Sequence, residues 1–177
     1  VNPNLVLTAD GLMQLGADQD GSRLNFGYAY RNWDWNSLGY LRYQSGSLAG
    51  NEPKLTAGLS AEYRRPQWGI RAGIDTRELI NDGDSFTAQG YLSGKYYFND
   101  WLAAGAWGMG LWQPSTSTHL YAYGLEGSVR ALPGLWLSAG YNLRGFEGLD
   151  IPNIYTRKGF YLRVDLTVDE TLGKSNK

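Results

Sequence analysis

The feature that most constrains this chain is a strict alternation of apolar and polar residues, clearest in residues 159–168. One set of side chains along it is apolar and the other is polar or charged: Phe160, Leu162, Val164, Leu166 and Val168 against Tyr161, Arg163, Asp165 and Thr167. Side chains along a β-strand point to opposite faces with a period of two, so this segment predicts a strand with one apolar face. That face must meet either a protein core or a lipid bilayer.

The same alternation recurs in nine earlier segments, so we predict an all-β protein of about ten antiparallel strands, with 8 to 12 as the range. The chain has 24 glycines and 14% aromatic residues, a composition that favours closely packed strands over helices. The predicted strands are 5–15, 24–31, 39–44, 55–64, 68–77, 88–98, 101–111, 121–131, 135–144 and 159–168.

The connections between these segments alternate in length, short after every second strand and longer after the others. Strands of about 10 to 13 residues, short periplasmic turns and longer outer loops are typical of a transmembrane up-and-down β-barrel. We therefore predict a single domain over 1–177, with a barrel at 5–168, a periplasmic tail at 169–177 and both termini periplasmic. The chain starts inside an apparent strand, so Val1 is interpreted either as a mature N-terminus or as a fragment boundary.

Charged residues favour the membrane interpretation over a soluble barrel whose apolar face points inward. A solvated outer face would favour Lys and Glu, but the polar face of these strands is rich in Arg, Gly, Ser and Thr. We predict that its charges pair inside a narrow lumen and block it. The predicted lumen residues are Asp10, Arg31, Arg42, Glu62, Arg64, Arg71, Asp75, Arg77, Lys95, Glu126, Arg130, Arg144, Arg163 and Asp165.

Two further expectations concern the lumen. The small residues of strand 101–111 are predicted to face it and to give the charges room: Ala104, Ala106, Gly108 and Gly110. The partners of Arg163 and Asp165 are expected on the first and ninth strands.

Large aromatic residues gather near the strand ends, where amphipathic rings suit the two interfaces of a bilayer. They are Trp68, Trp101, Trp112, Tyr30, Tyr43, Tyr63, Tyr96, Phe98, Tyr121 and Tyr141. In a soluble barrel large rings would more often converge toward the middle of the strands.

Residues 157–164 follow the order polar-x-Gly-x-x-apolar-x-apolar, which resembles the signal by which bacterial outer-membrane barrels are recognised for assembly. Gly159, Leu162 and Val164 occupy the matching positions. The chain departs from that signal because it continues through Asp169 to Lys177 instead of ending on an aromatic residue.

Residues 123–163 resemble the C-terminal outer-membrane barrel of large bacterial surface proteins whose upstream regions are repeated domains. The matching elements are Tyr123–Ser128, Trp136–Leu143, Gly145–Glu147 and Tyr155–Arg163. The resemblance covers the C-terminal part of the chain, and the first hundred residues match in pattern alone. It implies an anchor for a larger polypeptide and supplies no catalytic residue.

Few residues suggest chemistry. There is no cysteine, the net charge is −1, and no apolar run of about 18 residues predicts a transmembrane helix. His119 beside Ser115 and Ser117 would permit a hydrolase at the outer rim, whereas an ordinary loop histidine is the alternative. The loop pairs Asp82/Asp84 and Glu147/Asp150 are interpreted as solvated acids rather than cation ligands.

We therefore predict an integral outer-membrane barrel, not an enzyme, without cofactor, metal or nucleic acid. It would anchor a larger envelope protein or partner complex. Its expected partners are lipopolysaccharide, phospholipid, the barrel-assembly machinery and an envelope protein. The alternatives are a small porin or ligand-binding barrel and, third, the rim hydrolase.

Overall fold

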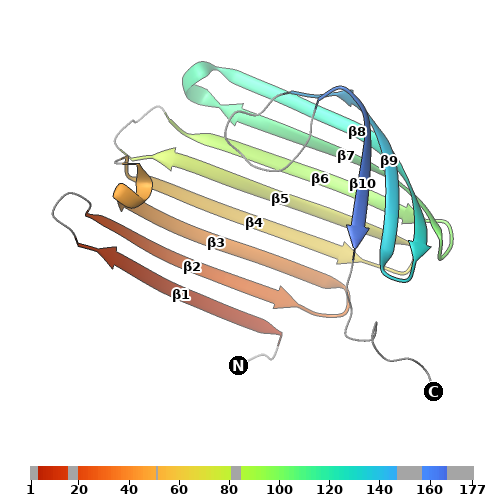
Figure 1. The fold of residues 1–177 in the computed structure, drawn as a ribbon, viewed down its shortest axis with the longest axis horizontal. Helices are drawn as coiled ribbons and strands as arrows, with labels where there is room; N and C mark the ends of the chain where they lie inside the picture. Colours follow the sequence, from red (N-terminus) through yellow and green to blue (C-terminus); the bar gives the residue numbers. More distant parts are fainter. Residues whose placement is uncertain (1–3, 16–19, 51, 81–84, 147–156, 167–177) are drawn as a thin grey trace.

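The structure, a computed structural model, describes residues 4–15, 20–50, 52–80, 85–146 and 157–166. Within them the chain forms one sheet of ten strands (Figure 1). The strands are β1 Leu5–Gln14, β2 Gly21–Arg31, β3 Trp35–Gly46, β4 Lys54–Arg64, β5 Trp68–Leu79, β6 Thr87–Tyr97, β7 Leu102–Gln113, β8 Thr118–Leu132, β9 Leu135–Arg144 and β10 Gly159–Leu166. Two single-turn 3₁₀ helices, η1 Ser47–Ala49 and η2 Pro114–Thr116, lie between strands. No helix of the described chain is long and apolar enough to cross a membrane.

The order of the strands in the sheet is their order in the chain, and every neighbouring pair is antiparallel. The prediction of an all-β, up-and-down sheet of ten strands is confirmed. Short turns at 32–34, 65–67, 98–101 and 133–134 join strands at one end; at the other end the connections are longer except for 114–117, which is as short as 98–101. Thr167, Val168 and the predicted tail 169–177 lie outside the described residues.

The register of the ladders fixes which residues share a face, because directly opposite residues point the same way. Phe26 is opposite Leu41, which is opposite Ala57. One position earlier, Asn25 is opposite Arg42, which is opposite Thr56. The apolar and the charged faces predicted for single strands therefore continue from strand to strand.

The charged face is the concave one. Contacts between strands that are not neighbours occur on this face: Lys95 on β6 reaches Glu126 on β8, and Trp107 on β7 reaches Tyr161 on β10. Such contacts need the sheet to curl toward them, and Figure 1 shows the curl at the β7–β10 end. The apolar face is convex, so Leu125 on β8 is 56% exposed and Phe160 on β10 is 84% exposed.

Strand β7 departs from the prediction because its faces are reversed. Gly105 lies opposite Glu126, so the odd-numbered residues of β7 point to the concave side. Ala103 and Met109 are accordingly buried, and the Trp107 ring contributes its indole N–H to the interior. The small row Ala104, Ala106, Gly108 and Gly110 lies on the convex face instead and does not line a lumen.

The interior is filled unevenly, because β1 and β10 are the two edges of the sheet. The concave face of β6–β9 buries Gln89, Ala122, Ser128, Ser138 and Asn142 almost completely. On the same face of β1 and β3, however, Val6 is 56% exposed and Leu38 is 51% exposed. Strands β8–β10 curl over their own half of the sheet and leave the β1–β3 half uncovered.

Three tyrosines on the concave face lie flat over glycines of the adjacent strand. Tyr40 is opposite Gly58, Tyr91 is opposite Gly73, and Tyr161 is opposite Gly140. A Cβ added to any of these glycines would collide with the tyrosine ring. A large ring over a glycine closes the gap that the missing side chain leaves and fixes the ring in place.

We predict that Gly140→Ala destabilises the protein by about 1–3 kcal/mol, since overpacking of this order displaces the Tyr161 ring. Gly127→Ala is the matched control, because a Cβ on Gly127 meets no atom within contact range. Urea unfolding of the detergent-refolded variants, followed by tryptophan fluorescence, measures both. Equal stability of the two variants would contradict the ring-on-glycine packing.

Candidate functional site: the charged inner face

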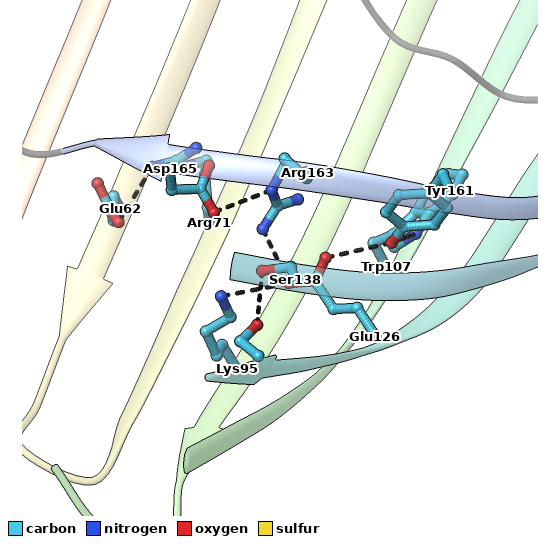
Figure 2. Close-up of polar contacts among 10 residues, drawn as sticks. Glu62, Arg71, Lys95, Trp107, Glu126, Ser138, Tyr161, Arg163 and Asp165 are labelled. Atoms are coloured by element: carbon cyan, nitrogen blue, oxygen red, sulfur yellow. Dashed lines mark hydrogen bonds and ion pairs between the residues drawn. The ribbon is translucent and has the colours of Figure 1, made fainter. Parts of the chain in front are cut away.

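Glu126 on β8 is the centre of the most buried polar cluster of the concave face (Figure 2). Its side chain is 7% exposed and lies 3.3 Å from Lys95 Nζ of β6 and 2.9 Å from Arg163 Nη2 of β10. The Tyr161 hydroxyl donates a third contact to Glu126 Oε2 at 3.1 Å. A carboxylate taken out of water is stable only when its charge and lone pairs are satisfied in this way.

Aromatic side chains enclose this cluster. The Trp107 indole N–H donates to the Tyr161 hydroxyl at 3.1 Å, and Lys95 Nζ lies 5.8 Å from the centre of the Trp136 ring. Ser138, which lies opposite Arg163, shares a buried hydrogen bond of 2.8 Å with Ser128. These neighbours exclude water from Glu126 and so strengthen its ion pairs.

The charges continue from β10 toward the middle of the sheet. Arg163 Nε donates to Asp165 at 3.0 Å. On β4 and β5, Glu62 accepts from Arg64 at 2.8 Å and from Arg71 at 3.3 Å. Figure 2 shows Asp165 of β10 on the side of Arg163 that faces Glu62 and Arg71.

A third polar group lies on the uncovered half of the concave face. Asn25 donates to Asp10 at 2.8 Å and accepts from Arg42 at 2.8 Å. Arg23 lies 3.9 Å from Asp10, and the Tyr40 hydroxyl donates to Asp75 at 3.2 Å. Unlike Glu126, Asp10 keeps most of its side chain exposed.

The structure thus brings ten of the predicted lumen residues into polar contacts on one face: Asp10, Arg42, Glu62, Arg64, Arg71, Asp75, Lys95, Glu126, Arg163 and Asp165. Four others have no ion pair within the described part of the chain: Arg31, Arg77, Arg130 and Arg144. Arg23 was missed, although it has the same parity in its strand as Asn25 and Arg31. The sequence analysis also missed the hydrogen bonds that Tyr161 and Trp107 contribute to this cluster.

The expected partners of the β10 charges need a correction. Arg163 pairs with Glu126 on β8 and with Asp165 on its own strand, so the expectation for the ninth strand is wrong. The carboxylate comes from β8 because β9 places the small Ser138 opposite Arg163. The Arg163 side chain therefore extends past β9. In the described sheet β1 and β10 are the two opposite edges, so these contacts do not test the partner expected on the first strand.

Within the described residues, the side chains considered for a hydrolase or a metal site do not come together. His119 is exposed at the start of β8, and no hydrogen bond joins it to Ser115 or Ser117. In the same part of the chain no three His, Cys, Asp or Glu side chains form a metal-binding group. The loop acids Asp82, Asp84, Glu147 and Asp150 lie outside the described residues.

Aromatic rings of the convex face gather at the short-turn end of the sheet. Ring centres are 4.6 Å apart for Trp35 and Tyr63, 5.2 Å for Tyr63 and Trp68, and 5.2 Å for Tyr96 and Phe98. Trp68 lies opposite Tyr96, which joins the two groups of rings. At the other end, Phe86 contacts Trp112 and Tyr141 contacts Phe160.

One cation belongs to the ring cluster at the short-turn end. Arg65 lies over the Tyr63 ring, donates to its hydroxyl at 2.7 Å and lies 3.5 Å from Asp34. The hydrogen bond to Tyr63 and the charge of Asp34 raise the pKa of Arg65, which is fully charged at any physiological pH. The ring cluster therefore ends in a fixed positive charge at the turn.

Comparison with known proteins adds little to this description. No protein-family model matches the chain, and no curated protein matches it. A solved structure described as "Unveiling the Mechanism Behind the in-meso Crystallization of Membrane Proteins" is similar over 87% of this chain and 78% of its own, at 12% identity and a TM-score of 0.31. This likeness is too slight to bear on fold or function.

We predict that Glu126→Gln destabilises the protein by about 3 kcal/mol, because Lys95 and Arg163 would then share no carboxylate in a mostly buried site. Glu78→Gln is the control, since Glu78 lies on the convex face near the end of β5 and belongs to no cluster. Adding Lys95→Met to Glu126→Gln should recover part of the loss. The free energy of unfolding of each variant is measured in detergent. An unchanged value for Glu126→Gln would contradict the stabilising role given to the ion pairs of Glu126.

Proposed function

We propose that the protein is a membrane-spanning β-barrel of the outer-membrane type, and that it anchors a larger envelope or surface protein. The observation that carries the proposal is the convex face. Across the ten described strands it presents a continuous apolar surface on which Glu78, one residue from the end of β5, is the single formally charged side chain.

A surface of this kind is unsuited to water. Large side chains of the convex face are about half exposed in mid-strand, among them Phe26, Leu59, Ile74, Leu92 and Leu125. The largest apolar patch on an ordinary soluble monomer covers a few hundred Å². Lipid chains would cover such a face without penalty, whereas a charge there would cost about 2–4 kcal/mol at the middle of the bilayer.

The direction of the curl supports the same proposal. A soluble up-and-down barrel would turn its apolar face inward and its charges outward. Here the charges meet one another across strands on the concave side, through pairs such as Lys95–Glu126 and Arg163–Glu126. The convex side is therefore the side that a barrel would present to its surroundings.

The two groups of aromatic rings match the expected thickness of a bilayer. Trp101 precedes β7 and Trp112 lies near its end. A strand rises about 3.3 Å per residue, and at a tilt of about 40° this span covers about 28 Å along the membrane normal. A hydrocarbon core of about 30 Å would thus be bounded by rings on both sides.

The anchoring role rests on the resemblance of residues 123–163 to C-terminal barrels of repeat-containing surface proteins, and on the filled half of the concave face. Paired charges and rings over β6–β10 leave little room for a solute path. The proposed partners are lipopolysaccharide and phospholipid around the barrel, the assembly machinery that would read Gly159, Leu162 and Val164, and the anchored protein.

Electrophoretic mobility with and without boiling tests the membrane barrel. Chain refolded in detergent should migrate as a compact band that shifts on heating, because a closed sheet resists unfolding by detergent alone. A boiled sample and a sample refolded without detergent serve as controls. A chain that is soluble and monomeric without detergent, and shows no compact band, would contradict the proposal.

Planar bilayer recordings test the blocked lumen. We expect no steady single-channel current from the refolded protein, because Arg and carboxylate side chains pair across the interior. An established porin in the same bilayer provides the positive control. Large, steady conductance would refute the anchor with a blocked lumen and favour the small porin.

The native gene product distinguishes an anchor from a free-standing barrel. Mass spectrometry of the protein isolated from membranes with an antibody to this barrel should find it joined to a larger upstream polypeptide. A native product whose mature N-terminus is Val1 would contradict the anchoring role and leave the membrane barrel unaffected.

A further inference from the structure

The two edges of the sheet, β1 and β10, are staggered by nearly the whole length of a strand. The stagger appears when a row of directly opposite residues is followed across the sheet from Asn4, whose carbonyl accepts from the Arg31 N–H. The row passes through Arg31, Asn36, Glu62, Arg71, Ser93, Trp107, Gly124 and Asn142 and reaches Gly159. It starts just before β1 at the short-turn end and finishes at the first residue of β10, at the long-loop end.

A stagger of this kind is what closing a tilted sheet into a barrel requires. Both edges also have reasons to be covered. Their N–H and C=O groups would be unsatisfied in lipid, and their apolar side chains are the most exposed ones of the ten strands, such as Leu7 on β1 and Leu162 on β10. With ten strands, β10 meets β1 in the antiparallel sense that all the other ladders have.

Two registers seat all of β10 on β1 while keeping concave-facing residues opposite concave-facing residues. Gly159 lies opposite Gln14 in the first and opposite Leu12 in the second. The first places Arg163 opposite Asp10 and Asp165 opposite Thr8. The second places Asp165 opposite Val6 and leaves Arg163 opposite Thr8, so no opposite charges face each other.

We propose that β1 pairs with the free edge of β10 in the same chain, in the register that sets Asp10 opposite Arg163. This inference rests on the membrane barrel proposed above and specifies how it closes. Opposite charges directly across a ladder stabilise the pairing, whereas an acid facing a valine has no partner there.

The backbone supports a close approach of these two side chains. The Asn4–Arg31 bond shows that even-numbered residues of β1 direct their backbone groups toward β2. The odd-numbered residues therefore direct theirs to the free edge, so Asp10 and Arg163 form a non-hydrogen-bonded pair. Side chains approach most closely at such pairs, with Cα atoms about 4.5 Å apart. Arg163 would then join Asp10 to the Glu126 cluster.

Disulfide trapping on the convex face tests the register without touching the charges. The chain has no cysteine of its own. In the proposed register Ala9 lies opposite Val164, with Cα atoms about 5.5 Å apart, a separation that a disulfide can bridge. The pair Ala9→Cys with Val164→Cys should oxidise several-fold more completely than Ala9→Cys with Leu162→Cys, which matches the second register.

The assay uses refolded protein that gives the compact band on unboiled gels, so that closure and membrane folding are measured separately. A compact band with the Leu162 pair oxidised preferentially, or with neither pair oxidised, would overturn the proposed register while the membrane barrel stands. Oxidation only between chains, seen when the two single variants are mixed, would show that a second copy occupies the edge. Loss of the compact band in wild-type protein would overturn both proposals.

Discussion

The structure depends on one constraint, the register of nine antiparallel ladders, of which the β8–β9 ladder shifts at Tyr123/Gly124 and at Arg130/Leu132. Each ladder keeps directly opposite residues on the same face, so a residue's position in its strand decides whether it meets charges or apolar side chains. A slip of one residue in any strand would move a row such as Arg163 and Asp165 to the convex face. The separation of charge from apolar surface over the whole sheet therefore follows from the register alone.

The concave face then determines which charges find partners. The closest contacts of Glu126 come from β6 and β10, two strands away on either side, because β7 and β9 place Gly105 and Gly140 opposite it. These glycines clear the space in which Lys95, Arg163 and the Tyr161 ring converge. Curvature of the sheet and small residues between charged ones act together, and the half of the sheet without this curvature keeps its charges exposed.

Much of the fold could be predicted from the sequence because a period-two pattern needs no knowledge of distant contacts. The alternation of single strands was predicted correctly, and ten of the charges predicted for a lumen make polar contacts on one face of the sheet, while the lumen itself stays a prediction. The faces of β7 were not predicted correctly, because the bulky residues Trp107 and Met109 alternate there with alanine and glycine and no charge marks the polar side. The pairing of Gly105 with Glu126 on one side and with Lys95 on the other reveals the orientation. Such a register between strands cannot be read from the sequence of either strand alone.

The same reason explains the error in the partners of Arg163. Adjacent strands are the natural candidates when only the order of strands is known, whereas a long side chain on a curved face can pass over a serine to reach the next strand. The resemblance of residues 123–163 to membrane barrels suggested an anchor but could not specify these contacts. Arg23 could have been predicted, because it lies an even number of residues from Asn25 and Arg31 and therefore shares their face of β2.

The central claim is that the convex face contacts lipid, and nitroxide accessibility tests it most directly. Single cysteines at successive positions of β4, from Thr56 to Ala61, can be labelled because the chain has no other cysteine. In bilayers we expect labels at Ala57, Leu59 and Ala61 to collide preferentially with oxygen, and labels at the positions between them to lack this preference. Equal oxygen accessibility at all six positions, or a preference on the Thr56 and Ser60 side, would contradict the account.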